Sequence, residues 1–281
     1  MIDLHTHSNF SDGSETPESI IETAKKIGLS AIALTDHDTF DGLERAATKA
    51  EELGVPLIPG CEVSSLYNQN TSVHVLCYFV SDSKSPLGLY LATLRQDRIS
   101  RNERLVTRLN ELGADISLDE VEKEAGGGLI GRPHFAQVLV NRKIAGSLEN
   151  AFNVWLGNKG KAYIPKERTE LRELVSAVKL SGGVTSLAHP LSGSFSFDQL
   201  EQNLIPLREL GIVGIECHYG KYSPGTRLKL AALAEQYGFI PTGGSDFHGK
   251  YKPELSIGTG EGDLAIADGV LEKLIAAKPE L

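Results

Sequence analysis

The sequence predicts an α/β fold in which strands alternate with helices and one helical insertion interrupts the alternation. Short apolar runs typical of buried strands are followed by segments in which apolar residues recur at helical spacing. This alternation stops after Phe79 and resumes at Leu171. The length of 281 residues is enough for one large α/β domain with a small insertion.

The expected elements follow in order along the chain. A first strand is expected at Ile2 to Leu4, and the first helix begins after Thr16 and Pro17, which suit the N-cap and the first helical position. Gly28 ends this helix. Further strands are expected at residues 31–34, 57–63, 73–79, 184–188, 212–217 and 239–242, and further helices at residues 40–53, 87–112, 171–180, 200–210 and 226–237.

The break in the alternation indicates a second structural unit. Residues 87–112 have the pattern of one long helix, and the chain from there to about Tyr163 reads as helical or irregular. We therefore expect a barrel domain formed by residues 1–93 and 166–281. Residues 94–165 are expected to form a small helical insertion domain.

The composition excludes several classes of partner. The formal net charge of −9 argues against broad binding to long nucleic acid or to an anionic membrane, although it allows a small phosphorylated substrate. The three cysteines lie in apolar runs without the spacing of a metal site, which predicts reduced thiols and a cytoplasmic location. We expect no membrane span, no signal peptide and no obligate protein partner.

The N-terminal segment carries the first candidate metal ligands. His5 and His7 follow the first expected strand with a spacing of two residues, so their side chains point to the same face. Asp12 lies in the loop that follows. Two imidazoles and a carboxylate in this arrangement can ligate one cation.

Further candidate ligands lie near the ends of the later strands. His37, Glu62 and His189 each follow or end a strand, His74 lies within one, and Asp246 and His248 follow the last one. Taken singly, they have simpler explanations, such as a core histidine for His74. Taken together, they would cost several kcal/mol per unpaired buried charge at one barrel mouth unless cations were bound there.

Four motifs in this set resemble the PHP family, named for polymerase and histidinol phosphatase domains. They are His5-Thr6-His7, Thr35-Asp36-His37, His189-Pro190 and Ser245-Asp246-Phe247-His248. The resemblance extends over the whole chain. It implies a distorted (β/α)7 barrel that holds three divalent metal ions.

The resemblance also implies how the ions are shared. His5, His7, Glu62 and Asp246 would hold the first ion, Glu62 with His74 and His189 the second, and Asp12 with His37 and His248 the third. Many family members have histidine where this chain has Asp12. An oxygen ligand favours a harder ion, so Mn²⁺ is expected, with Zn²⁺, Fe²⁺ or Mg²⁺ as alternatives.

Such ions would let the protein hydrolyse a phosphate ester. They can clamp the phosphoryl oxygens and lower the pKa of a water to about 7, so that this water becomes the nucleophile. The leaving alkoxide needs a proton or a metal. Asp36, His134 and His218 are candidates for this catalytic role, and the sequence does not choose among them.

The insertion is expected to select the substrate. Arg101-Asn102, Gly131-Arg132-Pro133-His134 and Lys161 resemble the PHP subgroup that carries a helical insertion. That subgroup includes 3′,5′-nucleotide bisphosphate phosphatases and enzymes that trim short RNA from the 5′ end. A second phosphate held by Arg101, Arg132 or His134 would explain a preference for bisphosphates.

The expected activity is therefore removal of the 3′-phosphate from nucleoside 3′,5′-bisphosphates, such as conversion of adenosine 3′,5′-bisphosphate to AMP. The alternatives within the same chemistry are a 5′→3′ exonuclease on short 5′-phosphorylated RNA and a histidinol-phosphate-type phosphatase. A non-catalytic metal-binding PHP module is an alternative from a different class. A deaminase-type amidohydrolase also opens with His-x-His, but the usual strand-end lysine is not found in the sequence.

Overall fold

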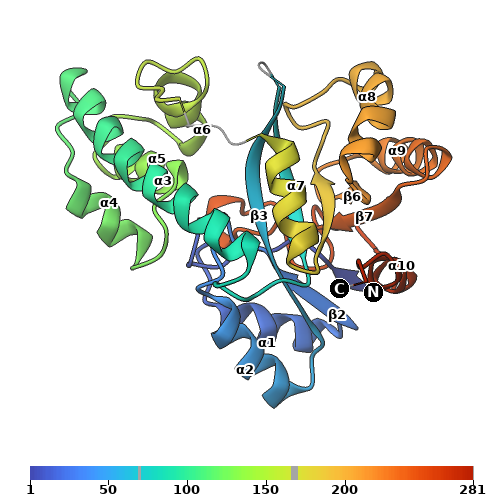
Figure 1. The fold of residues 1–281 in the computed structure, drawn as a ribbon. Coiled ribbons are helices and arrows are strands. Elements are labelled where there is room, and N and C mark those ends of the chain that lie inside the picture. The colour runs from blue at the N-terminus through green and yellow to red at the C-terminus, as the bar shows by residue number, and fades with distance from the viewer. Residues whose placement is uncertain (69–70, 166–169, 281) are drawn as a thin grey trace.

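The computed structural model describes residues 1–68, 71–165 and 170–280, and its centre is a nearly closed barrel of seven strands (Figure 1). The strands pair in the order of the sequence, and the amide of Leu4, just after the first strand, bonds to Gly243 in the last one at 3.3 Å. The strands are β1 Ile2–Asp3, β2 Ala31–Leu34, β3 Leu57–Asn68, β4 Thr71–Tyr78, β5 Val184–Ala188, β6 Gly214–Tyr219 and β7 Ile240–Gly244. The predicted barrel fold with a helical insertion is confirmed.

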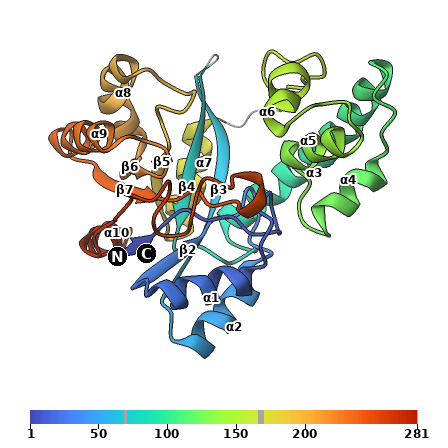
Figure 2. The same ribbon diagram turned by 180° about the vertical axis from the view of Figure 1, so that it is seen from behind.

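Helices cover the outside of the barrel and form the insertion (Figures 1 and 2). The first has the expected ends: Thr16 Oγ1 accepts a hydrogen bond from the Ser19 amide, and Gly28 adopts φ 75°. The helices are α1 Pro17–Ile27, α2 Leu43–Leu53, α3 Pro86–Glu111, α4 Leu118–Ala125, α5 Arg132–Asn141, α6 Leu148–Ala151, α7 Leu171–Leu180, α8 Phe197–Leu210, α9 Pro224–Gln236 and α10 Gly269–Ala276. Short turns of other helix types span Phe152–Leu156 (η1) and Gly249–Tyr251 (η2). Helix α10 was not predicted.

Strand β4 corrects the expectation of parallel strands throughout. It runs antiparallel to both β3 and β5, because β3 continues into β4 as a hairpin with no intervening helix. The mouth of the barrel therefore lies at the N-terminal part of β4. His74 pairs there with Ser64 of β3 and with Ala188, the residue before His189. The reversed strand explains how a histidine within a strand reaches the mouth.

The insertion has a hydrophobic core of its own. The first half of α3 packs into the barrel core through Leu87, Leu91 and Leu94, whereas Leu105 and Leu109 pack with the buried apolar residues of α4, α5 and the segment after α6. We propose that the domain boundary lies within α3, near residue 94. The predicted return to the barrel at residue 166 lies outside the described residues.

The insertion contacts two loops of the barrel mouth. The amide of Leu129 donates to the Phe10 carbonyl at 2.9 Å. The carboxylate of Glu124 in α4 accepts hydrogen bonds from Lys250 Nζ at 2.9 Å and from the Tyr251 hydroxyl at 3.0 Å. Across the described part of the chain, none of the helices has the length and apolar character needed to cross a membrane.

Candidate metal centre

Four buried side chains meet at the centre of the barrel mouth. The Nε2 atoms of His5 and His7 lie 3.0 Å apart, and each lies 3.2 Å from Glu62 Oε2 and 3.5 Å from Asp246 Oδ1. A tetrahedral cation with bonds of 2.0–2.1 Å separates its ligand atoms by about 3.4 Å. The spacing of these four atoms therefore fits one divalent cation.

The hydrogen bonds around these four side chains also favour a bound cation. His5 Nδ1 lies 2.9 Å from Glu216 Oε1, so this side of the ring is held by the carboxylate and Nε2 is left facing the set. Glu62 Oε2 also lies 3.3 Å from His37 Nε2, so imidazole nitrogens and carboxylate oxygens converge on one point.

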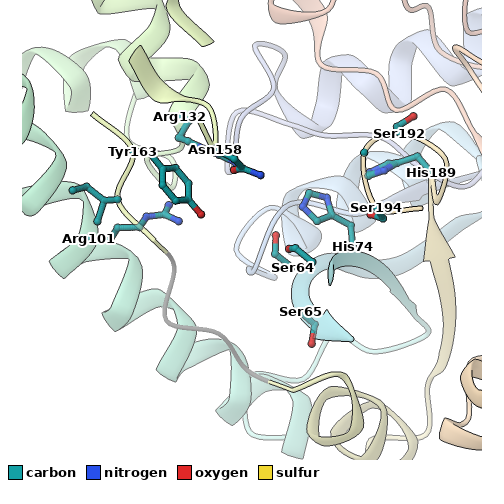
Figure 3. Close-up of a pocket in the computed structure, with 13 residues that line it drawn as sticks. Ser64, Ser65, His74, Arg101, Arg132, Asn158, Tyr163, His189, Ser192 and Ser194 are labelled. Carbon is teal, nitrogen blue, oxygen red and sulfur yellow. The ribbon is translucent and has the colours of Figure 1, made fainter. Parts of the chain in front are cut away.

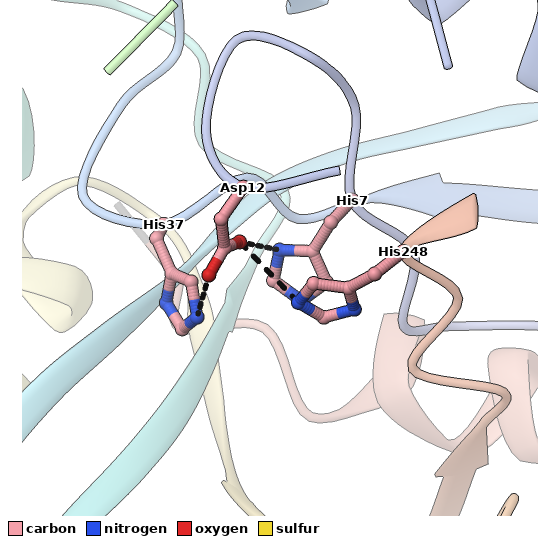
Figure 4. Close-up of side chains that lie close together, drawn as sticks. All are labelled: His7, Asp12, His37 and His248. Carbon is pink, nitrogen blue, oxygen red and sulfur yellow. Dashed lines mark ion pairs between the residues drawn. The ribbon is translucent and has the colours of Figure 1, made fainter. Parts of the chain in front are cut away.

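Asp12 is the centre of a second set (Figure 4). Its Oδ1 lies 3.3 Å from His248 Nε2 and 3.7 Å from His7 Nδ1, and its Oδ2 lies 3.7 Å from His37 Nε2. His248 Nδ1 donates to the Asp246 carbonyl at 2.8 Å, which leaves its Nε2 available as a ligand. Burial lowers the pKa of His37 to about 3, so its imidazole is neutral, which is the form that binds metals.

Glu62 joins these sets to a third one. Its Oε1 lies 2.8 Å from His74 Nδ1 and 2.9 Å from His189 Nε2, while its Oε2 faces the first set. Among the described residues, the buried Nδ1 atoms of His7, His37 and His189 have no hydrogen-bond partner. Together the three sets contain all nine predicted ligands, namely His5, His7, Asp12, His37, Glu62, His74, His189, Asp246 and His248. The residues present fit more than one divalent cation.

The sequence analysis did not identify three supporting residues. Glu216 holds His5 and also accepts the His189 amide at 2.7 Å. The Tyr219 hydroxyl donates to Asp246 Oδ2 at 2.9 Å, and Lys252 Nζ lies 2.5 Å from the same oxygen. Glu216 could have been found from its buried strand, because an acidic residue in such a run requires a partner.

The structure does not bring His218 to the metal centre. The ladder between β6 and β7 shifts by one residue between Glu216 and His218, and this bulge changes which side chains share a face. Tyr219 therefore reaches Asp246, whereas half-buried His218 lies near Arg227 and Glu235 of α9. His218 lines none of the cavities described below, so its proposed role in proton transfer is not supported.

The other two candidates for proton transfer have structural partners. Asp36 accepts hydrogen bonds from the Ser8 amide at 2.7 Å, the Ser8 hydroxyl at 2.6 Å and the Ser11 hydroxyl at 2.6 Å, and thus fixes the loop between His7 and Asp12. His134 is 1% exposed, and its Nδ1 accepts from the Gly131 amide at 3.0 Å, which caps α5. Neither side chain lines the cavities at the metal centre.

A cavity of about 250 Å³ separates the insertion from the barrel (Figure 3). The insertion contributes Arg101, Arg132, Asn158 and Tyr163, and the barrel contributes His74, His189 and the serines Ser64, Ser65, Ser72, Ser192 and Ser194. An adjoining cavity of about 160 Å³ brings Arg98, Arg101 and Arg132 onto one surface with the candidate ligands Asp12, His37 and His74. Cationic side chains and candidate ligands therefore share one space.

Two of these arginines have no acidic partner within the part of the chain that the structure describes. Arg98 forms an ion pair with Asp38, but Arg101 and Arg132 form none with the carboxylates of the described residues. Burial lowers the pKa of Arg101 to about 10, and Arg98 and Arg132 add to this effect, yet the guanidinium stays charged at neutral pH. A pair of cations in such a cavity can bind an anion.

The remaining predicted substrate residues have other contacts. The Asn102 side chain donates to the Ile130 carbonyl at 3.2 Å and so supports the segment before α5. The exposed Lys161 ammonium lies 5.4 Å from the centre of the Trp155 ring, and Lys161 does not line the cavities at the centre. Arg98, Asn158 and Tyr163 line the cavities instead, and only the spacing of Arg98 from Arg101, one helical turn, could have indicated any of them.

The comparisons with known proteins agree with this geometry. Residues 3–177 match the family model described as PHP domain. Over 248 residues the chain is 30% identical to the 5′-3′ exoribonuclease Rnm of Escherichia coli, which covers 88% of this chain and 84% of that protein. It is also 30% identical over 248 residues to the 3′,5′-nucleoside bisphosphate phosphatase of Chromobacterium violaceum, covering 88% of this chain and 87% of that protein.

A solved structure from Bifidobacterium adolescentis, named as a candidate metal-dependent phosphoesterase, has the same fold. It matches with a TM-score of 0.87 and 33% identity, and the match covers 100% of this chain and 97% of that one.

Proposed function

Because the chain belongs to the PHP family and is a metal-dependent phosphoesterase, we propose that it removes the 3′-phosphate from nucleoside 3′,5′-bisphosphates, such as adenosine 3′,5′-bisphosphate, to give AMP. The observation that carries this proposal is the position of Arg101 and Arg132. Arg101 is buried and Arg132 is half-buried, neither forms an ion pair with a carboxylate of the described residues, and both share a cavity surface with His37 and His74. One phosphate would lie at the metal centre and the other at the arginines.

The chain's own residues would prepare the reaction in two ways. Glu216 and the carbonyl of Asp246 orient the rings of His5 and His248 so that their Nε2 atoms face the centre. Arg132 and Arg101 would bind the non-reacting phosphate and hold the ester in one orientation. Divalent cations, when bound, supply Lewis acidity toward the phosphoryl oxygens and an activated water.

We propose three cations, held by the three sets built around Glu62 and Asp12. Each set combines imidazole nitrogens with carboxylate oxygens. Mixed nitrogen and oxygen ligands suit Mn²⁺ better than a set of soft thiolates would, and no cysteine belongs to the sets.

A second candidate is 5′→3′ exonuclease activity on short 5′-phosphorylated RNA. It is favoured by the relative from Escherichia coli and by Tyr163, whose ring on the cavity wall beside Arg101 could stack against a base. The two activities use the same chemistry and the same cavity. A non-catalytic module is disfavoured because the relatives are named as a phosphatase and an exoribonuclease.

Parallel assays on the Mn²⁺-loaded protein test the proposal. The substrates are adenosine 3′,5′-bisphosphate, 3′-AMP and a 5′-phosphorylated oligoribonucleotide. We expect kcat/KM for the bisphosphate to exceed that for 3′-AMP about tenfold or more, because only the bisphosphate has a second phosphate for the arginines. Equal values for both nucleotides would contradict the proposal, and a higher value for the oligoribonucleotide would favour the exonuclease.

A further inference from the structure

Lys252 extends the cationic surface to a part of the active site that the arginines do not line. A cavity of about 390 Å³ contains the candidate ligands Asp12, His37 and His74 and is bordered by Lys252 and Tyr219. The cavity of about 160 Å³ that contains Arg98, Arg101 and Arg132 is also lined by those three ligands, but neither Lys252 nor Tyr219 lines it. Lys252 follows η2, in the loop that begins at His248. The centre therefore has a cationic group on two different sides.

The two oxygens of Asp246 have different partners. Oδ1 lies 3.5 Å from the Nε2 atoms of His5 and His7, whereas Oδ2 receives the Tyr219 hydroxyl at 2.9 Å and Lys252 Nζ at 2.5 Å. An ammonium group has three donors, and Asp246 Oδ2 is the one hydrogen-bond partner of Lys252 Nζ among the described residues. The side chain is 30% exposed, so its other donors can reach a ligand in the cavity.

Electrostatics indicate what that ligand is. Asp246 does not depend on Lys252 for an Oδ2 hydrogen bond, since Tyr219 already provides one. The carboxylates Asp12, Glu62 and Asp246, even with Glu216 behind His5, cannot neutralise the three divalent cations proposed above, so an ammonium beside the loaded centre adds to an excess of positive charge. A phosphate dianion offsets this excess.

We propose that Lys252 is a catalytic residue whose ammonium binds a phosphoryl oxygen of the scissile group. It acts at the reacting phosphate, whereas Arg101 and Arg132 act at the second phosphate. This inference rests on the phosphoesterase activity and is independent of the preference for bisphosphates. Loss of the Lys252 charge should therefore affect monophosphates and bisphosphates equally.

The test compares three substitutions with a matched control. Lys252→Met and Lys252→Gln remove the charge, and Lys252→Arg retains it. The control is Lys221→Met, because exposed Lys221 pairs with Glu254 and borders no cavity of the centre. The measurements are binding of inorganic phosphate to the Mn²⁺-loaded protein by calorimetry, and metal content by mass spectrometry.

We expect both neutral variants to keep the metal content of the parent protein and to bind phosphate about tenfold more weakly or worse. Their kcat/KM should fall by the same factor for 3′-AMP and for the bisphosphate, and Lys252→Arg should recover part of the loss. Unchanged phosphate affinity would overturn the proposal. Loss of metal in both neutral variants would also overturn it, because Lys252 would then only position Asp246.

Discussion

The barrel and the insertion hold their functional side chains in different ways. In the barrel, residues from segments as distant as His5 and Asp246 are buried together, with His5 Nε2 3.5 Å from Asp246 Oδ1. In the insertion, a local apolar core around Leu105 and Leu109 presents arginines along one face of α3 and at the start of α5. The reactive groups therefore belong to the barrel, and the groups proposed to choose the substrate belong to a separate core.

The two units meet at the loops that carry metal-ligand candidates. Leu129 bonds to Phe10, two residues before Asp12, and Glu124 bonds to Lys250 and Tyr251, just after His248. The insertion can therefore influence the second set of ligands without supplying any of its members. Substitutions in the barrel should therefore change turnover, and substitutions in the insertion should change the preference between substrates.

The largest effect is expected in the barrel. His7→Ala or Asp246→Ala should reduce turnover about a thousandfold or more while the protein stays folded, because each removes a candidate ligand atom from the first set. Turnover, metal content and circular dichroism check this prediction. His218→Ala, on the same sheet but beside α9, should keep both metal and activity. A variant of His7 with full metal and parental rates would disprove the assignment.

A smaller effect is expected for a residue that does not face the cation itself but hydrogen-bonds to a candidate ligand. Glu216→Gln should weaken metal binding about 10- to 100-fold, because an amide does not fix the tautomer of His5 as a carboxylate does. Competition with a chelator measures the affinity. Excess Mn²⁺ should restore most of the turnover, and failure to do so would mean that Glu216 acts on more than metal binding.

In the insertion, Arg132→Ala should raise KM for the bisphosphate about tenfold and change KM for 3′-AMP by less than about threefold. The cause is the loss of a half-buried cation that borders the cavity and has no acidic partner among the described residues. Steady-state kinetics on both substrates measure the two values. Arg108→Ala is the control, since exposed Arg108 pairs with Glu111 on the same unit. Equal changes for both substrates would remove Arg132 from the selectivity role.

The smallest effect is expected at the junction. Glu124→Ala removes the acceptor of Lys250 and Tyr251 and should reduce kcat/KM only about two- to fivefold for both nucleotides. The loss should fall on both substrates because the loop after His248, not the arginine site, is loosened. A loss confined to the bisphosphate would instead show that the junction orients the insertion.

Several candidate ligands could be located from the sequence because residues that follow parallel strands converge in a barrel, as His37 and His189 do. Glu62 follows the part of β3 that pairs in parallel with β2, but it does not end the strand as predicted, because β3 continues to Asn68. The sequence also shows that Asp36 and His134 belong to motifs, but it does not show what their side chains do. Hydrogen bonds to Ser8, Ser11 and Gly131 determine those roles, and they depend on tertiary structure.

Two further features depend on interactions that a local pattern does not contain. The residues of β4 look the same in a parallel or an antiparallel strand, and its direction follows from the hairpin with β3. The bulge that exchanges His218 for Tyr219 depends on the register with β7. The cavity wall formed by Asn158 and Tyr163 comes from an irregular segment that has no periodicity to interpret.

The carboxylate of Glu62 has a consequence for how this centre could diverge among natural sequences. Its Oε2 faces His5 and His7, and its Oε1 faces His74 and His189, so any rotamer that improved one side would withdraw an oxygen from the other. A substitution of Glu62 would therefore disturb both sets at once, whereas a substitution of His74 would remove one nitrogen from a single set. Related sequences are therefore expected to vary at an outlying imidazole such as His74 before they vary at the shared glutamate.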